Sequence, residues 1–519
     1  MTRELPESIN ERVTQQKQCT TGLRSFCCKE CLMGPCHFTT HSAKGVCGAT
    51  RPLIAARNIL RLSIGGAAAH CGHASDLLNH FGENITQEES TAFMPDYMKN
   101  LWEKIGLEYP DNRPGSHFRQ ISDAIHLSAM GVGGDYVEML KWALSMGIVD
   151  GYYGLYNATL TEDRHFGKPK VQKGHLNPGC IDSSKVNIAI HGHEPMLAEA
   201  MVKQAANFSN VNIIGVCCTG ASLLARHNIP HAAHFLLQED VVATGLIEAM
   251  VVDAQCIQPS LNDLCECFHT QLITTSHIAK ISRATHMPFS SQQEAYAVAF
   301  KIIESAIDNK ANRNAAHEQH FVATKQETTQ AVIGFTDESV PFWMIADEIA
   351  ERKCKGVIAV VGCVNPRSPI NEWVETFRKL SNDYYILTTG CMAFEFGMKG
   401  LLDGKRFFHL GSCVNNSRVA EVFRKIAQYL DKPTYELPFI VSAPAPITEK
   451  SVSIGMFFAA LGCSLHIGEP SRFASDPVVA STLDSVFNNI FGTRLYATND
   501  PEQFLTQLQS YEVEVAARI

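Results

Sequence analysis

Short apolar stretches in the middle of the chain decide the fold. They read VNIAIHG at 186–192, VNIIGVCC at 211–218, AMVVDAQC at 249–256 and QLITTS at 271–276. Each is rich in β-branched residues, and helical stretches lie between them. The pattern then restarts with KGVIAVVGC at 355–363, YYILTTGC at 384–391, RFFHLGSC at 406–413, ELPFIVSAP at 436–444 and CSLHIGEP at 463–470. Strands that alternate with helices predict parallel sheets with helices on both faces, in two Rossmann-like α/β domains.

The residues before these stretches have a helical pattern. Examples are ESINERVTQQ at 7–16, RPLIAARNILRLSIGGAAAH at 51–70 and DYVEMLKWALSMGIV at 135–149. The last has apolar residues three and four apart, which is the spacing of one helix face. We therefore expect three domains. They are a helical domain at 1–180, a first Rossmann-like domain at 181–330 and a second at 331–519, with the active site between the two sheets.

Composition limits the partners and the compartment. The chain has 519 residues with 44 Lys+Arg and 53 Asp+Glu, so its formal charge is −9, and it has no basic surface to favour nucleic acid. The N-terminus lacks the apolar core of a secretory signal. The most apolar stretch, 453–468, is shorter than the ~18 residues of a membrane span and predicts a buried helix and strand. We expect a cytoplasmic protein whose 18 cysteines favour metal or redox roles over disulfides.

Cysteines recur at the carboxyl ends of the predicted strands, where open parallel sheets bind ligands. They are Cys217, Cys218, Cys256, Cys363, Cys391 and Cys413, and His193 follows another strand in HGHEP. A buried cysteine can also be a small, inert core residue. That explanation is adequate for any one of them, but the repetition at equivalent positions favours a metal cluster.

A second group of cysteines lies near the N-terminus, at Cys19, Cys27, Cys28, Cys31, Cys36 and Cys47. Four thiolates at such short spacings can wrap an iron–sulfur cubane. Structural zinc is the alternative, but it favours paired C-x2-C knuckles and only one such pair is present. The remaining cysteines, Cys71, Cys180, Cys265, Cys267, Cys354 and Cys463, fit no cluster pattern.

These motifs resemble the nickel–iron carbon monoxide dehydrogenases of anaerobic microbes along nearly the whole chain. The resemblance implies that Cys19 and Cys27 hold a cluster shared across the twofold axis of a homodimer. It implies that Cys28, Cys31, Cys36 and Cys47 hold a [4Fe–4S] cluster within the subunit. These clusters would relay electrons to a ferredoxin-like acceptor.

The strand-end segments HGHEP, GVCCTG, VVDAQC, VVGC, TTGC and GSCVNNSR resemble the ligand segments of that family's catalytic cluster. By this resemblance the cluster is held by His193, Cys218, Cys256, Cys363, Cys391 and Cys413, the last of them on nickel. His191 and Cys217 are weaker candidates for the histidine and for the cysteine beside the unique iron. SAPAPITEKSVSIG resembles the segment of the active-site lysine, Lys450, and places Ile454 over the open nickel site.

GGAAAHCGH resembles the segment that moves protons beside the cluster, which gives His70 and then His73 that role. Asp76 and Asn79 continue the series where further histidines are expected, so proton export would need another route, such as His80 or water. The implied reaction oxidises CO with water to CO2, two protons and two electrons. A soft nickel could take CO while a neighbouring iron activates water. Lys450 would stabilise the developing carboxylate, and His70 would accept a proton.

Two other functions stay open. The related hybrid-cluster proteins hold a nickel-free iron–sulfur–oxo cluster and reduce hydroxylamine or similar small nitrogen species. Departures from the dehydrogenase pattern, such as Ala445 and Pro446 in place of an acidic residue and a tryptophan, leave room for that alternative. The third hypothesis is a redox sensor or electron carrier whose clusters do not turn over a substrate.

Overall fold

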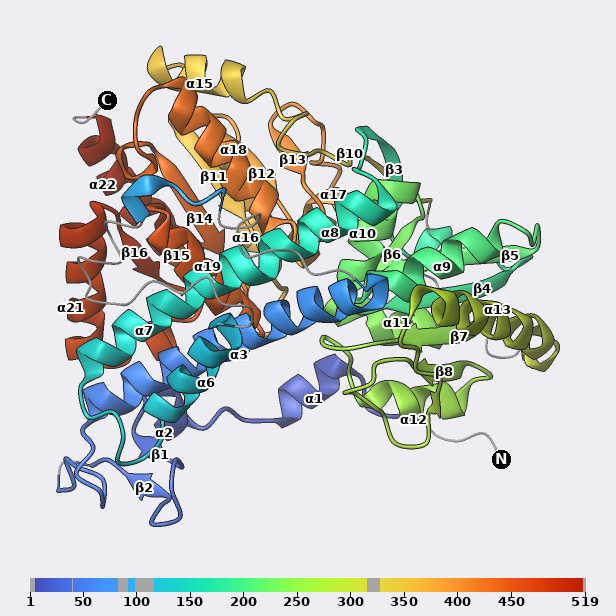
Figure 1. Ribbon diagram of the computed structural model, residues 1–519, viewed down its shortest axis with the longest axis horizontal. Helices are drawn as coiled ribbons and strands as arrows, with labels where there is room; N and C mark the ends of the chain where they lie inside the picture. Colours follow the sequence, from blue (N-terminus) through green and yellow to red (C-terminus); the bar gives the residue numbers. More distant parts are fainter. Residues whose placement is uncertain (1–4, 40, 83–91, 99–115, 315–326, 517–519) are drawn as a thin grey trace.

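Two parallel sheets and a layer of long helices make up the protein (Figure 1). The computed structural model describes residues 5–39, 41–82, 92–98, 116–314 and 327–516. The fold therefore agrees with the predicted α/β class. No helix in these ranges is long and apolar enough to cross a membrane.

The first sheet has eight strands in the order β10-β3-β6-β5-β4-β7-β8-β9. All neighbours are parallel except β10, which runs antiparallel to β3 at one edge. The bounds are β3 (Gln172–Leu176), β4 (Val186–His191), β5 (Val211–Val216), β6 (His231–Ala233), β7 (Ile247–Val252), β8 (Gln271–Thr274), β9 (Thr285–His286) and β10 (Thr329–Ile333). Both β3 and β10 extend past the limits of 181 and 330 expected for this domain. The division into three domains stays a prediction.

The second sheet has six parallel strands in the order β13-β12-β11-β14-β15-β16. They are β11 (Gly356–Val360), β12 (Tyr384–Thr388), β13 (Phe407–His409), β14 (Phe439–Ala443), β15 (Ser464–Ile467) and β16 (Leu495–Ala497). The inner strands β11, β12, β14 and β15 are buried at every position. Their continuous apolar runs are typical of parallel strands covered on both faces.

Helices cover both sheets. Those that follow the strands of the first sheet are α9 (Pro195–Ala205), α10 (Cys217–His227), α11 (Gln238–Ala243), α12 (Ser260–Cys267) and α13 (Gln292–Asn309). Those of the second sheet are α15 (Phe342–Ala350), α16 (Ile370–Leu380), α17 (Gly390–Met398), α18 (Asn416–Tyr429), α19 (Glu449–Ala460), α20 (Pro470–Phe473), α21 (Pro477–Val486) and α22 (Pro501–Ala516). The stretch 453–468 is a buried helix and strand, as predicted, since α19 and β15 contain it.

The N-terminal region forms a small cysteine-bearing lobe and a layer of long helices. The lobe contains α1 (Ile9–Gln15), α2 (Thr20–Leu23), β1 (Cys27–Cys28) and β2 (Cys36–His37). The helical layer contains α3 (Arg51–Phe81), α6 (Ser116–Leu127), α7 (Tyr136–Val149), a π-helical segment (Asp150–Tyr156) and α8 (Asn157–Phe166). In Figure 1, α3 and the α7–α8 rod run across the molecule from the second sheet to the first.

Close packing of α3 against α19 fixes the position of the site. A methyl group on Gly66 of α3 would lie 2.3 Å from Cβ of Ser453 on α19, closer than real Cβ contacts allow. The helices therefore approach at a point where only glycine fits. One apolar core joins these helices to the second sheet, and another joins the two sheets to each other.

Candidate functional site

The two sheets meet at the places where their strand order reverses. In the first sheet the chain runs outward from β4 through β5 and β6 and then returns to β7 on the other side of β4. In the second sheet it runs from β11 through β12 and β13 and then returns to β14 beside β11. Crevices beyond the carboxyl ends of strands at such reversals are the usual ligand sites of parallel sheets. Two direct side-chain contacts join the loops at these two crevices.

One contact is made by Lys450 and His193. Lys450 lies on α19, after β14, and its Nζ is 2.6 Å from Nε2 of His193, which follows β4. The other contact runs from Nε2 of Gln255, after β7, to Oε1 of Glu449 at 2.9 Å. Residues predicted from separate strand ends thus converge on one buried site.

His193 is oriented as a metal ligand is. Its Nδ1 lies 3.2 Å from the carbonyl oxygen of Ala254, to which it can donate, so in the neutral ring Nε2 carries the lone pair that a metal would bind. That Nε2 faces Lys450 and lies 4.0 Å from Sγ of Cys256. The backbone N–H of His193 donates to Asp253, which also receives the N–H of Glu194. The loop after β4 is therefore held by a carboxylate from the neighbouring strand end.

Of the six cysteines at the strand ends, with Cys217 counted as a candidate, four form two linked pairs. Cys413 hydrogen-bonds Cys218. This bond lowers the pKa of Cys218 well below its usual value, and the nearby His193 lowers it further. Cys217 instead hydrogen-bonds Cys391. Cys363 lies 3.4 Å from Oγ of Ser451 on α19. All but Cys256 are buried, so these thiols face an interior site.

The charges of the site depend on one another. The pKa of Lys450 is raised: burial lowers it, but the thiols of Cys256, Cys218, Cys413 and Cys363 outweigh burial. The pKa of His193 rises to about 10, although burial and Lys450 lower it, because Cys218 and Cys256 favour the imidazolium. A buried cation among soft thiols is thus a built-in feature of the site.

Of the two weaker candidates, His191 bonds a glutamine, whereas Cys217 lies beside Cys391. His191 is part of β4, and its Nε2 bonds Oε1 of Gln238 at 3.0 Å. Cys217 has a positive φ of 55°, as does Cys256 at 57°, both next to strand ends where the chain turns sharply. Among the described residues, no three His, Cys, Asp or Glu side chains converge on a position for a single metal ion. Thiols and an imidazole are nonetheless the donor types that would suit an iron–sulfur cluster with nickel.

His70 and His73 lie on α3 above the site. Nδ1 of His70 is 2.6 Å from Oδ1 of Asp150, and both side chains are buried. Asp150 begins the π-helical segment, an irregularity common at functional sites. Burial, with His193, His70 and Lys450 nearby, lowers the pKa of His73 to about 3. Ile454 is buried on α19, one turn after Lys450.

Sequence reasoning missed Asp150, Asp253, Ser451 and Glu162, whose Oε1 lies 3.9 Å from Nε2 of His73. Asp253 had a usable signal, because it stands at a strand end three residues before Cys256. Asp150 and Glu162 had none, since both lie in a helical pattern far along the chain from their partners.

The N-terminal cysteines gather on the small lobe. Cys28 pairs with Cys36 across β1 and β2. The amide of Gly34 donates to the carbonyl of Cys31, and a methyl group on Gly34 would lie 3.2 Å from the carbonyl of Cys28. A methyl group on Gly45, two residues before Cys47, would lie 3.6 Å from Sγ of Cys36. Cys19 caps α2 and is exposed, and Cys27 is partly buried. The loop thus brings Cys28, Cys31, Cys36 and the segment before Cys47 together.

Two parallel sheets that meet over a thiol-rich, histidine-bearing site define the class of protein: a large α/β protein built around a redox metal centre. The chain belongs to the Prismane/CO dehydrogenase family, whose model matches residues 26–93 and 83–502. The predicted family is therefore confirmed. Membership implies iron–sulfur clusters.

Named relatives and solved structures agree. The chain is 32% identical to carbon monoxide dehydrogenase 1 of Methanosarcina acetivorans, over 95% of this chain and 92% of that protein. It superposes on carbon monoxide dehydrogenase IV from Carboxydothermus hydrogenoformans with a TM-score of 0.88 and 29% identity, covering 99% and 96% of the two chains. A Ni-free carbon monoxide dehydrogenase from Thermococcus sp. AM4, produced without CooC maturase, superposes with a TM-score of 0.90 and 28% identity. The match covers 99% of this chain and 94% of that chain. These relatives confirm the prediction of an oxidoreductase.

Proposed function

We propose that the chain oxidises CO with water to CO2, two protons and two electrons. The single observation that carries this proposal is the contact of Lys450 with His193 at 2.6 Å, in the midst of the strand-end cysteines. It puts a cation beside residues that would hold the cluster, where it can stabilise negative charge that develops on the substrate. The named relatives share the activity by name.

The proposed ligands of a nickel–iron–sulfur cluster are His193, Cys218, Cys256, Cys363, Cys391 and Cys413. Such a cluster, when bound, supplies a soft metal for CO and a Lewis-acidic iron for water. The ammonium of Lys450 stabilises negative charge that develops on the substrate. Ile454 adds an apolar side chain that keeps bulk water out. Of His70 and His73 on α3, His70 accepts a proton at Nε2, which has no hydrogen-bond partner, while Asp150 holds its Nδ1.

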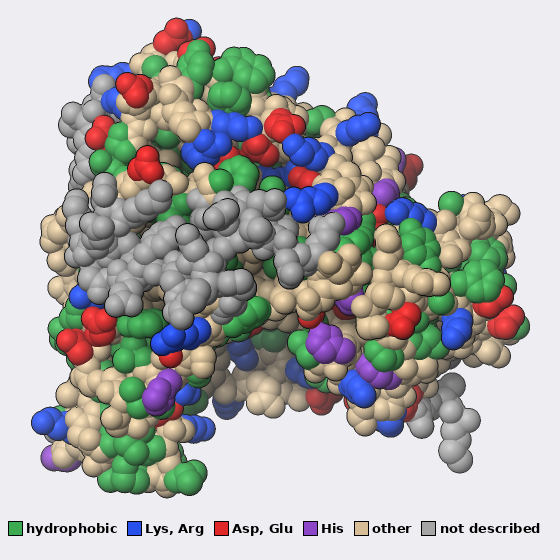
Figure 2. Space-filling model, viewed as in Figure 1, with side chains coloured by type: hydrophobic (Ala, Val, Ile, Leu, Met, Phe, Trp, Pro, Cys, Tyr) green, Lys and Arg blue, Asp and Glu red, His purple; other side chains and the backbone are tan. Residues whose placement is uncertain are grey.

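The electrons leave through the small lobe. We propose a [4Fe–4S] cluster on Cys28, Cys31, Cys36 and Cys47, and a second cluster on Cys19 and Cys27 at the interface of a homodimer. Exposed apolar side chains on this lobe support such an interface: Leu32 is fully exposed, Val46 is 70% exposed, and Figure 2 shows hydrophobic side chains gathered there. A ferredoxin-like protein would be the acceptor. A cytoplasmic location suits 18 cysteines that form no disulfide.

The test is anaerobic CO-dependent reduction of a viologen dye, with protein produced together with a nickel-inserting maturase. The maturase is needed because the Thermococcus relative made without one is described as Ni-free. We expect CO-dependent turnover. Hydroxylamine-dependent dye oxidation without CO turnover would favour the hybrid-cluster reductase, which the comparisons do not favour. Redox-active clusters with neither turnover would favour a sensor or electron carrier.

A further inference from the structure

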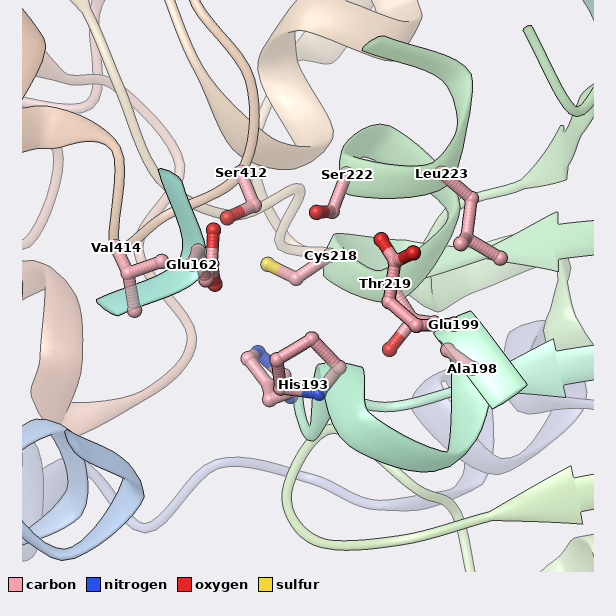
Figure 3. Close-up of a pocket in the computed structure, with 11 residues that line it drawn as sticks. Glu162, His193, Ala198, Glu199, Cys218, Thr219, Ser222, Leu223, Ser412 and Val414 are labelled. Atoms are coloured by element: carbon pink, nitrogen blue, oxygen red, sulfur yellow. The ribbon is translucent and has the colours of Figure 1, made fainter. Parts of the chain in front are cut away.

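A small cavity lies against the site, and Lys450 is not among the residues that line it. His193 and Cys218 line it, together with Glu162 of α8, Glu199 of α9 and Thr219 of α10. In Figure 3, Glu162 and Glu199 lie on opposite sides of the Cys218 side chain. The cavity volume of about 10 Å³ is enough for about one water molecule.

Two polar atoms of the cavity lining have no hydrogen-bond partner. They are Oε1 of Glu199 and Oγ1 of Thr219, on side chains that are 2% and 3% exposed. Leaving a buried polar atom unsatisfied costs about 1–3 kcal/mol, so proteins normally provide each with a partner. A cavity of this size with several polar groups is suited to an ordered water that bonds to them.

Side chains on the two sides of the cavity lead toward the site and toward the surface. On the inner side, Oε1 of Glu162 lies 3.9 Å from Nε2 of His73. On the outer side, Oε2 of Glu199 lies 2.7 Å from Nε2 of His227, the last residue of α10. The side chain of His227 is 25% exposed, so the outer end reaches solvent.

The surrounding charges keep this path polar. Glu162 is buried and bonds Nη2 of Arg226 at 2.8 Å, and Arg226 also bonds Asp163. Burial raises the pKa of Glu162, which Arg226 opposes. The charged groups around Glu199 are Arg226 and His227 from α10 and Glu162 from α8. Carboxylates and an imidazole in series can pass protons through a bridging water near neutral pH.

We propose that Glu162, Glu199 and His227, with the cavity between the two carboxylates, conduct protons from the site to solvent. This role rests on the proposed oxidation of CO, which releases two protons in each turnover. The path is separate from the His70–Asp150 pair. It begins beside His73. Further along α3, Asp76 and Asn79 stand where a histidine series would continue.

The test uses Glu199→Gln, His227→Gln and His227→Ala in the holoenzyme, with CO and a viologen dye. Proton transfer by a positioned side chain is worth roughly 10²–10⁴-fold, so we expect kcat to fall by at least about tenfold at an unchanged KM for CO. Added imidazole should restore the kcat of His227→Ala. His269→Gln is the control: it removes a His–Glu pair of 3.1 Å beside the first sheet that does not line the cavity, and it should keep wild-type kcat.

Wild-type kcat in both Glu199→Gln and His227→Gln would overturn the proposal, and so would a loss in His227→Ala that imidazole does not rescue. A second readout does not depend on turnover. A crystal structure of the holoenzyme should show an ordered water in the cavity, within hydrogen-bond distance of Oε1 of Glu199 and Oγ1 of Thr219. A cavity without an ordered water would overturn the proposal. A wild-type enzyme without CO turnover would instead contradict the proposed function.

Discussion

Nζ of Lys450 lies 2.6 Å from Nε2 of His193, although the two residues follow strands of different sheets. The contact places the cation between the two crevices rather than in either one. It is therefore a consequence of how the sheets pack, and it makes the charge of Lys450 part of the site.

Lys450→Met keeps most of the length of the side chain and removes its charge. We expect CO oxidation to fall by about 10²-fold or more, since a group that stabilises developing charge typically contributes that much. Iron and nickel contents should stay at wild-type levels. Lys399→Met, at an exposed position after α17, is the matched control. Turnover near the wild-type rate in Lys450→Met would remove the lysine from the mechanism.

Asp150→Asn tests the orientation of His70. The carboxylate lies 2.6 Å from Nδ1 of His70, and the amide would favour the wrong tautomer. We expect kcat to fall by about 10-fold to 10²-fold with little change in KM. Tyr156→Phe removes a hydrogen bond to Glu421 from the same π-helical segment and should affect thermal stability alone. Equal kcat losses in the two variants would mean that Asp150 acts only on folding.

The packing of α3 against α19 predicts that substituting alanine for two glycines of α3 has opposite effects on the free energy of unfolding. In Gly66→Ala the new methyl group would lie 2.3 Å from Cβ of Ser453, and we expect unfolding to become easier by about 1–3 kcal/mol. In Gly72→Ala no atom lies within 4 Å, so better helix propensity should stabilise by up to about 1 kcal/mol. Denaturant unfolding measures both. A neutral Gly66→Ala would show that the helices can separate freely.

Cys31→Ala tests the cluster of the small lobe. If Cys31 is a ligand, we expect the loss of about four iron atoms per chain, the content of one [4Fe–4S] cluster, and slow dye reduction. Cys267→Ala changes a cysteine of α12 with no predicted cluster and should keep full iron. Iron analysis after anaerobic purification decides the point. Unchanged iron in Cys31→Ala would contradict the proposed ligand.

His466 predicts an acid-sensitive stability. Burial lowers its pKa to about 4, and its ring bonds Oγ of Ser442 and the carbonyl of Thr498 in neutral form. In the unfolded chain His466 is protonated below about pH 6.5. The stability that neutral His466 contributes to the fold is therefore present above that pH and is lost as the pH falls toward 4. His466→Gln should be less stable at pH 7.5 but lose less stability on acidification to pH 5. Parallel stability curves for the two proteins would be inconsistent with a neutral His466.

The fold was largely predictable from sequence because parallel strands buried on both faces leave long apolar runs. The strands β4, β5, β7 and β8 lie where the runs from 186 to 276 indicate. The edge strands β10 and β16 escaped prediction, since β10 pairs antiparallel with a strand about 150 residues away and β16 has three residues.

The site was predictable only where it repeats at strand ends. Spacing could not choose between His191 and His193, because the choice depends on ring partners: Gln238 for one, Ala254 for the other. Asp150 could not be found, since its partner His70 lies 80 residues earlier and a π-helical segment leaves no period in the sequence. Contacts between separate helices and strands therefore could not be predicted from patterns in the sequence.

Anomalous scattering at the nickel edge tests the central claim most directly. Crystals of the protein, produced anaerobically with a nickel-inserting maturase, should show a nickel peak at Cys413, beside iron peaks near His193 and Cys218. A crystal with iron at these side chains and no nickel at Cys413, from protein made with the maturase, would contradict the account.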